Sequence, residues 1–314
     1  MLSRVAESLY WLGRYAERAE NTARIVSVNA NLLLDLPRGI SPGWSPMIAI
    51  FGAEADFESR YANYEERSVA RYLLTDADSP CSVLFVLRAA RENTRTMRDI
   101  VPREAWELLN ELYHYARDNA QAGLSKRGRH DYLQHVIRSI QTLSGLLLGT
   151  MNHDQGYSFL TLGRVLERAD MTTRLIDVRS NSLLPDTPAE LRSFAGVQWM
   201  SVLKSLSGYQ MYRQKMQSRL VRAKVLEFLL RDPEFPRAVA RCARLLEAGL
   251  RSLPCSEDCV RVLGGLQRVL QRGAVVELAE DQQALHAYLD ELQVHLAAVH
   301  AEIARAWFLH GASA

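Results

Sequence analysis

Two segments of the chain carry the same pattern of arginine and glutamate. Residues 12–24 read L-G-R-Y-A-E-R-A-E-N-T-A-R and residues 162–174 read L-G-R-V-L-E-R-A-D-M-T-T-R, so eight of 13 positions are identical at an offset of 150. A guanidinium holds a carboxylate or phosphate through two parallel hydrogen bonds, and a carboxylate can serve as a general acid or base. The charged residues shared by the two segments are Arg14, Glu17, Arg18, Arg24, Arg164, Glu167, Arg168 and Arg174.

The first segment lies in a long amphipathic pattern. Apolar side chains recur at a spacing of three or four from Leu2 to Leu33, which predicts one helix that ends before Pro37. The charged residues fall outside this apolar seam, where an ordinary helical bundle exposes them to water. One interpretation is therefore a solvated face, on which acid-first pairs four residues apart contribute only about 0.2–0.5 kcal/mol each.

Comparison of the two segments favours a buried or paired stripe over a solvated face. Seam positions differ between the copies, as Ala16 and Leu166 do, whereas the charged positions agree. A free surface is expected to vary faster than a core. Arg14 and Arg18 are also like charges four residues apart, which is unfavourable unless a negative group lies between them. Glu17 or Glu167 could supply that group, and so could an external carboxylate or phosphate.

A glycine occupies the same place in both segments. Gly13 and Gly163 fall inside predicted helices, where glycine costs about 1 kcal/mol relative to alanine. Their presence in both copies indicates the close approach of another backbone. We therefore expect the two motif helices to cross near these glycines, with their arginine and glutamate side chains interlocked.

A second pair of similar segments extends the repeat. Residues 69–83 and 225–239 are identical at six of 15 positions, at an offset of 156. Two copies in the same order predict two pseudo-symmetric halves, 1–150 and 151–314, within one domain that covers 1–314, and not a solenoid.

The fold class predicted for the chain is all-α, a helical bundle built from two repeats of about 150 residues. Alternating β-branched runs bounded by turns, which would indicate strands, are missing. A capping box at 187–190 and prolines at 46 and 80 suggest helix starts. After the first helix, helices are expected at about 62–74, 81–99, 102–120, 128–150, 155–181, 209–230, 236–252, 256–272 and 278–311.

Composition excludes several classes of protein. A net charge of +2 without a basic block gives no footprint for nucleic acid. Four cysteines in 314 residues do not make a disulfide framework, which favours a reducing cytosol. The first residues form a charged amphipathic helix with no apolar signal segment, and no run is long enough to span a bilayer. We therefore expect a cytoplasmic protein with neither nucleic acid nor membrane as a partner.

Other groups with chemical potential are weaker. Cys255 and Cys259 lack the further ligands that a structural zinc needs, so no metal is expected. His130 and His135, like His295 and His300, are five apart and do not share the geometry of a helical metal pair. His153 beside Asp154, at a helix entrance, could belong to a site. The phosphate-binding and hydrolase motifs that would indicate nucleotide or acyl chemistry are missing, and no cofactor is expected.

The motif L-G-R-x-x-E-R-A-[ED]-x-T-x-R, present twice, resembles the bacterial alpha-E family, an all-α domain with a Glu-Arg motif. The resemblance extends over the chain through the opening M-L-S-R-V-A-E-S-L-Y-W, the G-T-M-N-H-D-Q-G-Y-S-F run at 149–159, Trp199, Tyr212 with Arg213, and D-P-E-F-P-R-A-V at 232–239. Members occur beside circularly permuted ATP-grasp-type proteins, transglutaminase-like cysteine proteases and a proteasome-related hydrolase. The resemblance thus implies a part in a peptide- or amide-forming system, and it carries no assigned catalytic residues.

Two functions follow from these expectations. The first is a non-catalytic helical partner of an ATP-grasp-type ligase, which binds the ligase or a peptide or anionic ligand through the duplicated motif. The alternative is an enzyme of the same system in which Glu17 and Glu167 act as acid–base groups while arginines clamp a carboxylate or phosphate. Arginine neighbours lower the pKa of a carboxylate, which favours pairing over proton transfer near neutrality and hence the first function.

Overall fold

The chain is all-α, as the sequence predicts. The computed structural model describes residues 2–35, 43–181 and 192–308, and of residues 192–195 only the backbone. Within these ranges it contains helices and turns without a strand. The expected capping box at 187–190 and the last residues of the final predicted helix lie outside the described residues.

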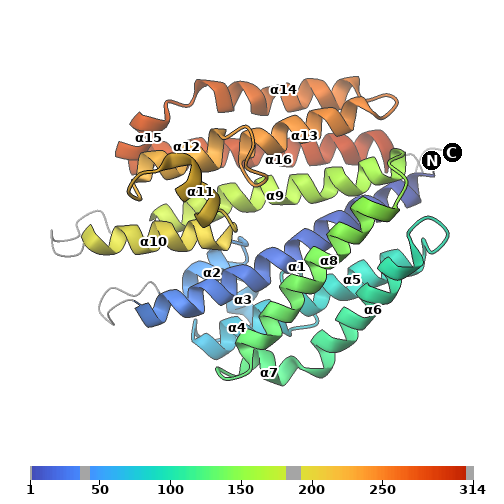
Figure 1. Ribbon diagram of the computed structural model, residues 1–314, viewed down its shortest axis with the longest axis horizontal. Helices are drawn as coiled ribbons and strands as arrows, with labels where there is room; N and C mark the ends of the chain where they lie inside the picture. The colour runs from blue at the N-terminus through green and yellow to red at the C-terminus, as the bar shows by residue number, and fades with distance from the viewer. Residues whose placement is uncertain (1, 36–42, 182–191, 309–314) are drawn as a thin grey trace.

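Two groups of four helices form the body of the fold, and in each group the four helices pack against one another in a closed ring (Figure 1). The first group contains α1 (Ser3–Asp35), α5 (Val83–Arg95), α6 (Arg103–Asp118) and α8 (Arg129–Thr150). The second group contains α9 (Gln155–Asn181), α13 (Val239–Arg251), α14 (Glu257–Arg272) and α16 (Gln282–Trp307). Helices α1 and α9 lie side by side in the middle of Figure 1, and the other helices of the two groups lie on opposite sides of this pair.

Shorter helices pack around these two groups. In the first half they are α2 (Ser45–Ala49), α3 (Glu54–Arg60), α4 (Glu66–Leu74) and α7 (Ala120–Leu124). In the second half they are α10 (Arg192–Ser205), α11 (Tyr209–Met216), α12 (Arg222–Arg231) and α15 (Val275–Glu280). Their buried side chains join one continuous hydrophobic core with the long helices, so the two groups share a single interior.

Helix starts follow local side-chain caps. Ser82 accepts a hydrogen bond from the Phe85 backbone nitrogen at 3.0 Å, so α5 begins at Val83 and not at the predicted 81. Asp154 accepts from the backbone nitrogens of Gly156 and Tyr157 at 2.8 and 3.2 Å, at the start of α9. These caps satisfy backbone donors that would otherwise lack partners at a helix end.

Two of the predicted helices are interrupted. The helix predicted over 209–230 is divided because Gln217 adopts a left-handed conformation (φ 45°) that ends α11. The helix predicted over 278–311 is divided because Asp281 turns away from the helical path and caps α16 through the backbone nitrogens of Gln283 and Ala284. Each break depends on the backbone conformation of one residue, which the spacing of apolar residues in the sequence does not predict.

Candidate functional site

The two motif helices meet backbone to backbone at their glycines. A Cβ atom at Gly13 would overlap the carbonyl oxygen of Leu160 and lie 2.9 Å from the backbone nitrogen of Arg164. A Cβ atom at Gly163 would overlap the carbonyl oxygen of Tyr10. The close approach expected from the paired glycines is therefore present, because any side chain would push the helices apart.

The two helices run parallel and in register beyond this point. Sixteen residues after Gly13, Asn29 on α1 accepts a hydrogen bond from Arg179 on α9 at 2.8 Å, so contacts persist at an offset of 150. Positions with the same place in the two motifs consequently face each other across the interface. This register brings each Glu-Arg pair opposite the other.

Glu167 on α9 is held by two arginines of α1. Arg18 donates from Nε to Oε1 at 2.5 Å and from Nη2 to Oε2 at 3.0 Å, a bidentate arrangement. Arg14 donates from Nε to Oε2 at 2.7 Å. The Glu167 residue is only 1% exposed, so its carboxylate depends on these donors in place of water.

Glu17 on α1 is held in the reverse direction. Arg168 on α9 donates from Nη2 to Oε2 at 2.7 Å and from Nε to Oε1 at 3.1 Å. Arg237, which lies just before α13, donates from Nη1 to Oε1 at 2.5 Å and is 7% exposed. The Glu-Arg neighbours of each motif thus exchange partners across the interface. We call the four residues Glu17, Arg18, Glu167 and Arg168 the reciprocal clasp.

Both carboxylates of the clasp are held in the ionised form. Burial by itself would raise the pKa of Glu167, but attraction to Arg18 and Arg14, with their hydrogen bonds, outweighs burial and lowers that pKa to about 2. Burial opposes ionisation of Glu17 in the same way, and Arg168 and Arg237 again lower its pKa. Each glutamate is therefore a fixed negative charge near neutrality.

The remaining motif arginines do not join the clasp. Arg24 bonds Glu20 at 2.5 Å and Arg174 bonds Asp170 at 3.0 Å, both within their own helices, as the spacing predicts. Arg164 stands where Arg14 stands in the first motif, but its Nε atom is buried without a hydrogen-bond partner in the described part of the chain. Arg237 binds Glu17 in the way that Arg14 binds Glu167, as its second arginine.

Arg237 is the site residue that the motif comparison missed. Besides Glu17 it bonds the Asn21 side-chain oxygen at 2.8 Å and Glu20 at 3.3 Å. It lies in the D-P-E-F-P-R-A-V run, and at the offset of 156 its counterpart is Cys81. Because a cysteine replaces it in the first half, comparison of the halves could not identify it. The signal available was an arginine inside a segment that resembles the family.

The two threonines of the motifs make corresponding contacts to this segment and its counterpart. Thr22 donates to the Cys81 carbonyl at 3.4 Å, and Thr172 donates to the Arg237 carbonyl at 3.0 Å. Each motif helix is thereby tied to the segment just before α5 or α13, in its own half. These bonds set the position from which Arg237 reaches Glu17.

An aromatic group closes one end of the interface. The Tyr10 hydroxyl bonds His300 Nδ1 at 2.8 Å, and the two rings stack with centroids 5.6 Å apart. The Arg14 guanidinium lies 5.5 Å from the centroid of the Trp11 ring. Burial, followed by the nearby Arg14 charge, lowers the pKa of His300 to about 4, so its imidazole is neutral near pH 7.

The cysteines and the His153–Asp154 pair form no bond with the clasp residues in the described part of the chain. Cys255 is exposed, whereas Cys81, Cys242 and Cys259 are buried, and all four are free thiols. His153 bonds the Leu148 carbonyl at 3.0 Å, while Asp154 caps α9. In the ranges that the structure describes, no three histidine, cysteine or acidic side chains are grouped so that they could hold a metal ion. None of the helices in those ranges combines the length and hydropathy needed to cross a bilayer.

Fold and site together define an all-α protein whose two central helices are joined by a reciprocal Glu-Arg clasp. The chain belongs to the Alpha-E family, described as a predicted alpha-helical domain with a conserved ER motif, whose model matches residues 1–308. Glu17-Arg18 and Glu167-Arg168 are the Glu-Arg dipeptides of the two motifs.

Relatives of the chain include longer proteins. Uncharacterized proteins of Mycobacterium bovis and Mycobacterium tuberculosis are each 26% identical to it over 324 residues, which cover 96% of this chain. The match takes up 35% of each relative, so the chain spans about a third of the length of these curated proteins. No solved structure matches the chain.

Proposed function

We propose that this chain is a non-catalytic helical partner of an ATP-grasp-type ligase in a cytoplasmic peptide- or amide-forming system. We propose further that its Glu-Arg motif is an internal clasp between two duplicated halves. The observation that carries the proposal is the occupancy of both glutamates: Glu17 and Glu167 are buried, ionised and each bound by two arginines of this chain.

The same occupancy argues against the alternative, an enzyme that uses these glutamates for acid–base chemistry. A general base needs a pKa near the working pH, whereas the pKa of Glu167 is about 2. Three of the motif arginines that could clamp a substrate carboxylate or phosphate, Arg14, Arg18 and Arg168, already bind Glu17 or Glu167. An incoming anion would have to displace a buried, hydrogen-bonded carboxylate to reach them.

Duplication is supported by pairs of contacts at matching positions. The parallel register at an offset of 150, the Thr22 and Thr172 bonds, and the two four-helix groups all relate residues of one half to counterparts in the other. The role as a partner is supported by the relatives, in which the matching segment is a third of a longer chain. Such a segment is suited to act together with other domains.

Co-expression tests this proposal. The tagged chain is produced with the circularly permuted ATP-grasp-type protein of the same gene neighbourhood, and the two are purified by affinity and size-exclusion chromatography. We expect one complex of defined stoichiometry, and ATP-dependent ligation by the complex or the ligase but not by this chain alone. Separate elution of the two proteins, or turnover by this chain alone, would overturn the proposal.

A further inference from the structure

A pocket at the end of α1 is the strongest candidate for a binding site outside the clasp. It has a volume of about 340 Å³ and lies between the last turns of α1, Trp44 and the first turn of α8. Ligand pockets in proteins typically have volumes of about 300–1,000 Å³. The clasp residues do not line this pocket, so a ligand here would leave both buried glutamates bound to their arginines.

The most buried part of the lining is apolar. Trp44 and Leu133 form this floor and are 8% and 1% exposed, and Ala30 and Leu33 extend it along α1. The guanidinium of Arg129 lies 5.5 Å from the centroid of the Trp44 ring. An apolar floor that is already formed binds the apolar part of a ligand without first having to be ordered.

Arg129 is fixed beside this floor by three hydrogen bonds. It is 5% exposed and donates to the carbonyls of Gly123 and Leu124 at 3.1 and 3.0 Å. Its third bond, from Nη1 to Oε1 of Glu66, is 2.7 Å long. A guanidinium that is bonded at all three nitrogens keeps one position, so the Trp44 ring packs beside a fixed neighbour.

One positive charge in the lining is unbalanced. Lys126 and Arg129 line the pocket with a single carboxylate, Glu66, so the formal charge of the lining is positive when His130 is counted as neutral. Oε2 of Glu66 lies 3.3 Å from Nζ of Lys126, while Oε1 is bonded to Arg129. The Lys126 side chain is 84% exposed. Because an exposed ion pair contributes only about 0–1 kcal/mol, this ammonium can turn to a ligand at little cost.

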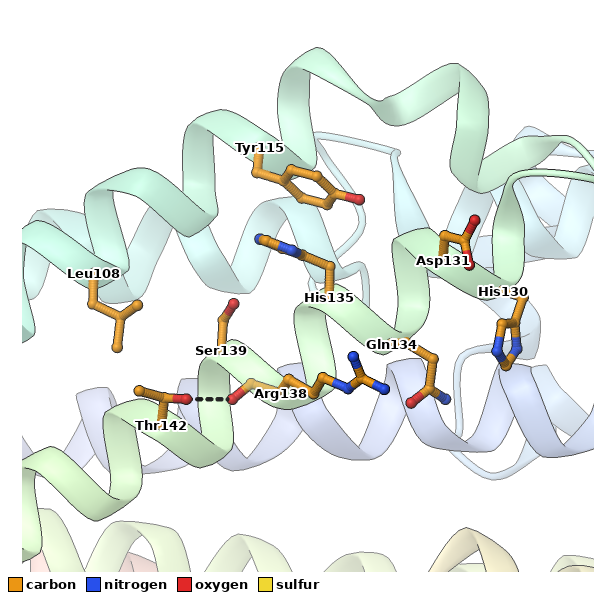
Figure 2. Close-up of a pocket in the computed structure, with 9 residues that line it drawn as sticks. All are labelled: Leu108, Tyr115, His130, Asp131, Gln134, His135, Arg138, Ser139 and Thr142. Carbon is orange, nitrogen blue, oxygen red and sulfur yellow. Dashed lines mark hydrogen bonds between the residues drawn. The ribbon is translucent and has the colours of Figure 1, made fainter.

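Three polar side chains of the lining have no partner in the described part of the chain. Ser27, Asn31 and His130 form neither a hydrogen bond nor an ion pair there through their side chains. Figure 2 shows His130 in the first turn of α8, at one end of an open groove between α6 and α8. In that groove Arg138 and Asp131 balance each other, so it selects no charge. The pocket at α1 differs in its excess positive charge and its buried apolar floor.

These features decide the class of ligand. An apolar floor favours an aromatic or aliphatic group, and a net positive rim favours an anion. An ammonium beside amide and hydroxyl groups suits a carboxylate, which accepts hydrogen bonds at both oxygens. The volume is near the lower end of the usual range, so the ligand is small.

We propose that this pocket binds a small carboxylate that carries an aromatic or branched aliphatic group, with that group on Trp44 and Leu133 and the carboxylate at Lys126. Free aromatic acids and the C-terminal residue of an apolar peptide share this chemistry. The inference is independent of the proposed ligase complex, because it rests on the lining of this pocket alone.

Isothermal titration calorimetry on the isolated full chain tests the inference. We expect N-acetyl-L-phenylalanine to bind saturably. Its amide, which lacks the carboxylate, and N-acetylglycine, which lacks the apolar group, should each bind at least about tenfold more weakly. Phenylpropionate separates the two sources of ligand. Equal affinity for phenylpropionate indicates a free acid, whereas affinity about tenfold lower indicates a peptide C-terminus whose amide also bonds the rim.

Variants of two neighbouring residues test the position of the carboxylate. Lys126→Gln should weaken the binding of N-acetyl-L-phenylalanine about tenfold, because a charge-assisted hydrogen bond is lost, and Lys126→Arg should keep most of the affinity. The matched control is Arg127→Gln, since Arg127 is exposed and does not line the pocket. It should change the affinity less than about twofold. Circular dichroism verifies that each variant is folded.

The indole N–H signals in nuclear magnetic resonance spectra locate the ligand. The Trp44 signal, assigned with Trp44→Phe, should move during the titration, while that of Trp199, which does not line the pocket, should stay in place. No saturable binding, equal binding of the acid and its amide, equal losses in Lys126→Gln and Arg127→Gln, or a stationary Trp44 signal would each overturn the inference. Ligand binding without a ligase complex would refute the proposed function and not this inference.

Discussion

Arg18 on α1 and Glu167 on α9 lie 149 positions apart in the chain and form a bidentate pair, with bonds of 2.5 and 3.0 Å. Arg168 and Glu17 form the reverse pair at 3.1 and 2.7 Å. In this arrangement the arginine of each Glu-Arg dipeptide bonds the glutamate of the other dipeptide and not the glutamate beside it. The Glu-Arg dipeptide is therefore explained as half of an interface, completed by the second dipeptide.

Replacing Arg18 by glutamine should strongly destabilise the protein. The substitution leaves the buried Glu167 carboxylate with Arg14 alone, and breaking a buried ion pair typically costs about 3–5 kcal/mol. The free energy of unfolding, measured by guanidinium titration followed by circular dichroism, should fall by that amount. Arg261→Gln on α14, which breaks an exposed pair with Asp258, is the control and should cost less than about 1 kcal/mol.

Arg168→Gln should produce a similar loss through Glu17. The double variant Arg18→Gln/Arg168→Gln should deviate from the sum of the single effects, because both pairs cross the same interface. Single variants that melt like the unaltered chain would show that the clasp does not stabilise the fold, and its arginines would then have to be examined as ligand-binding groups.

Alanine at Gly13 or Gly163 should separate the two central helices. The new methyl group would overlap a backbone carbonyl of the facing helix, which cannot move as a flexible side chain can. We expect a loss of about 1–3 kcal/mol or more in the free energy of unfolding. Gly145→Ala is the matched control, since Gly145 lies inside α8 and its Cβ would meet nothing within 4 Å.

The free energy of unfolding of the control, Gly145→Ala, should change in the opposite direction. Alanine in an exposed helix interior is favoured over glycine by about 1 kcal/mol, so Gly145→Ala should stabilise the protein. If Gly13→Ala were as stable as Gly145→Ala, the close approach of α1 and α9 would be wrong.

Acidification should weaken the clasp between about pH 4.5 and pH 2. A carboxyl group whose pKa is lowered by folding contributes stability above its unfolded pKa and loses it as the pH falls through the folded pKa. For Glu167 the folded pKa is about 2, below an ordinary value of 4.5. Denaturant midpoints measured every half pH unit should fall across this window.

Glu167→Gln supplies the comparison for this pH dependence. Glutamine does not titrate, so the variant should be less stable at neutral pH but should lose less stability from pH 4.5 to 2 than the unaltered chain. Parallel curves for the two proteins would show that Glu167 titrates alike in the folded and unfolded states, in conflict with its burial between two arginines.

The equivalent arginines Arg14 and Arg164 should respond differently to the same substitution. Arg14 bonds Glu167 at 2.7 Å, whereas the described residues give Arg164 no hydrogen bond or ion pair. Arg14→Gln should therefore reduce the free energy of unfolding by about 1–3 kcal/mol more than Arg164→Gln. Equal effects would indicate that Arg164 also binds Glu17, and Arg237→Ala would then be expected to have little effect.

The sequence predicts much of this arrangement because the similar segments 12–24 and 162–174 lie in the interface between α1 and α9. The bounds of α8 and α9 fall within one residue of the predicted 128–150 and 155–181. Gly13 and Gly163 correctly indicate the crossing, since a repeated cost of glycine inside a helix needs a local cause. The heptad assignment alone would place Glu17 in water; it is buried because α1 packs against both helix groups.

The features that could not be predicted depend on long-range or single-residue geometry. Arg237 bonds Glu17 across 220 positions of the chain. Because the corresponding residue of the first half is Cys81, comparison of the halves does not identify Arg237. The break at Gln217 depends on one left-handed residue.

The clasp also constrains the order of events during synthesis. Helix α1 is made before α9, and the partners of Glu17 and Arg18 emerge about 150 residues later. At a synthesis rate of about 5–20 residues per second that interval is about 8–30 s. During it, the N-terminal helices can assemble, but the central helix retains a charged, unmatched side. The nascent first half is thus a transient state that a chaperone, or a second nascent chain, could recognise.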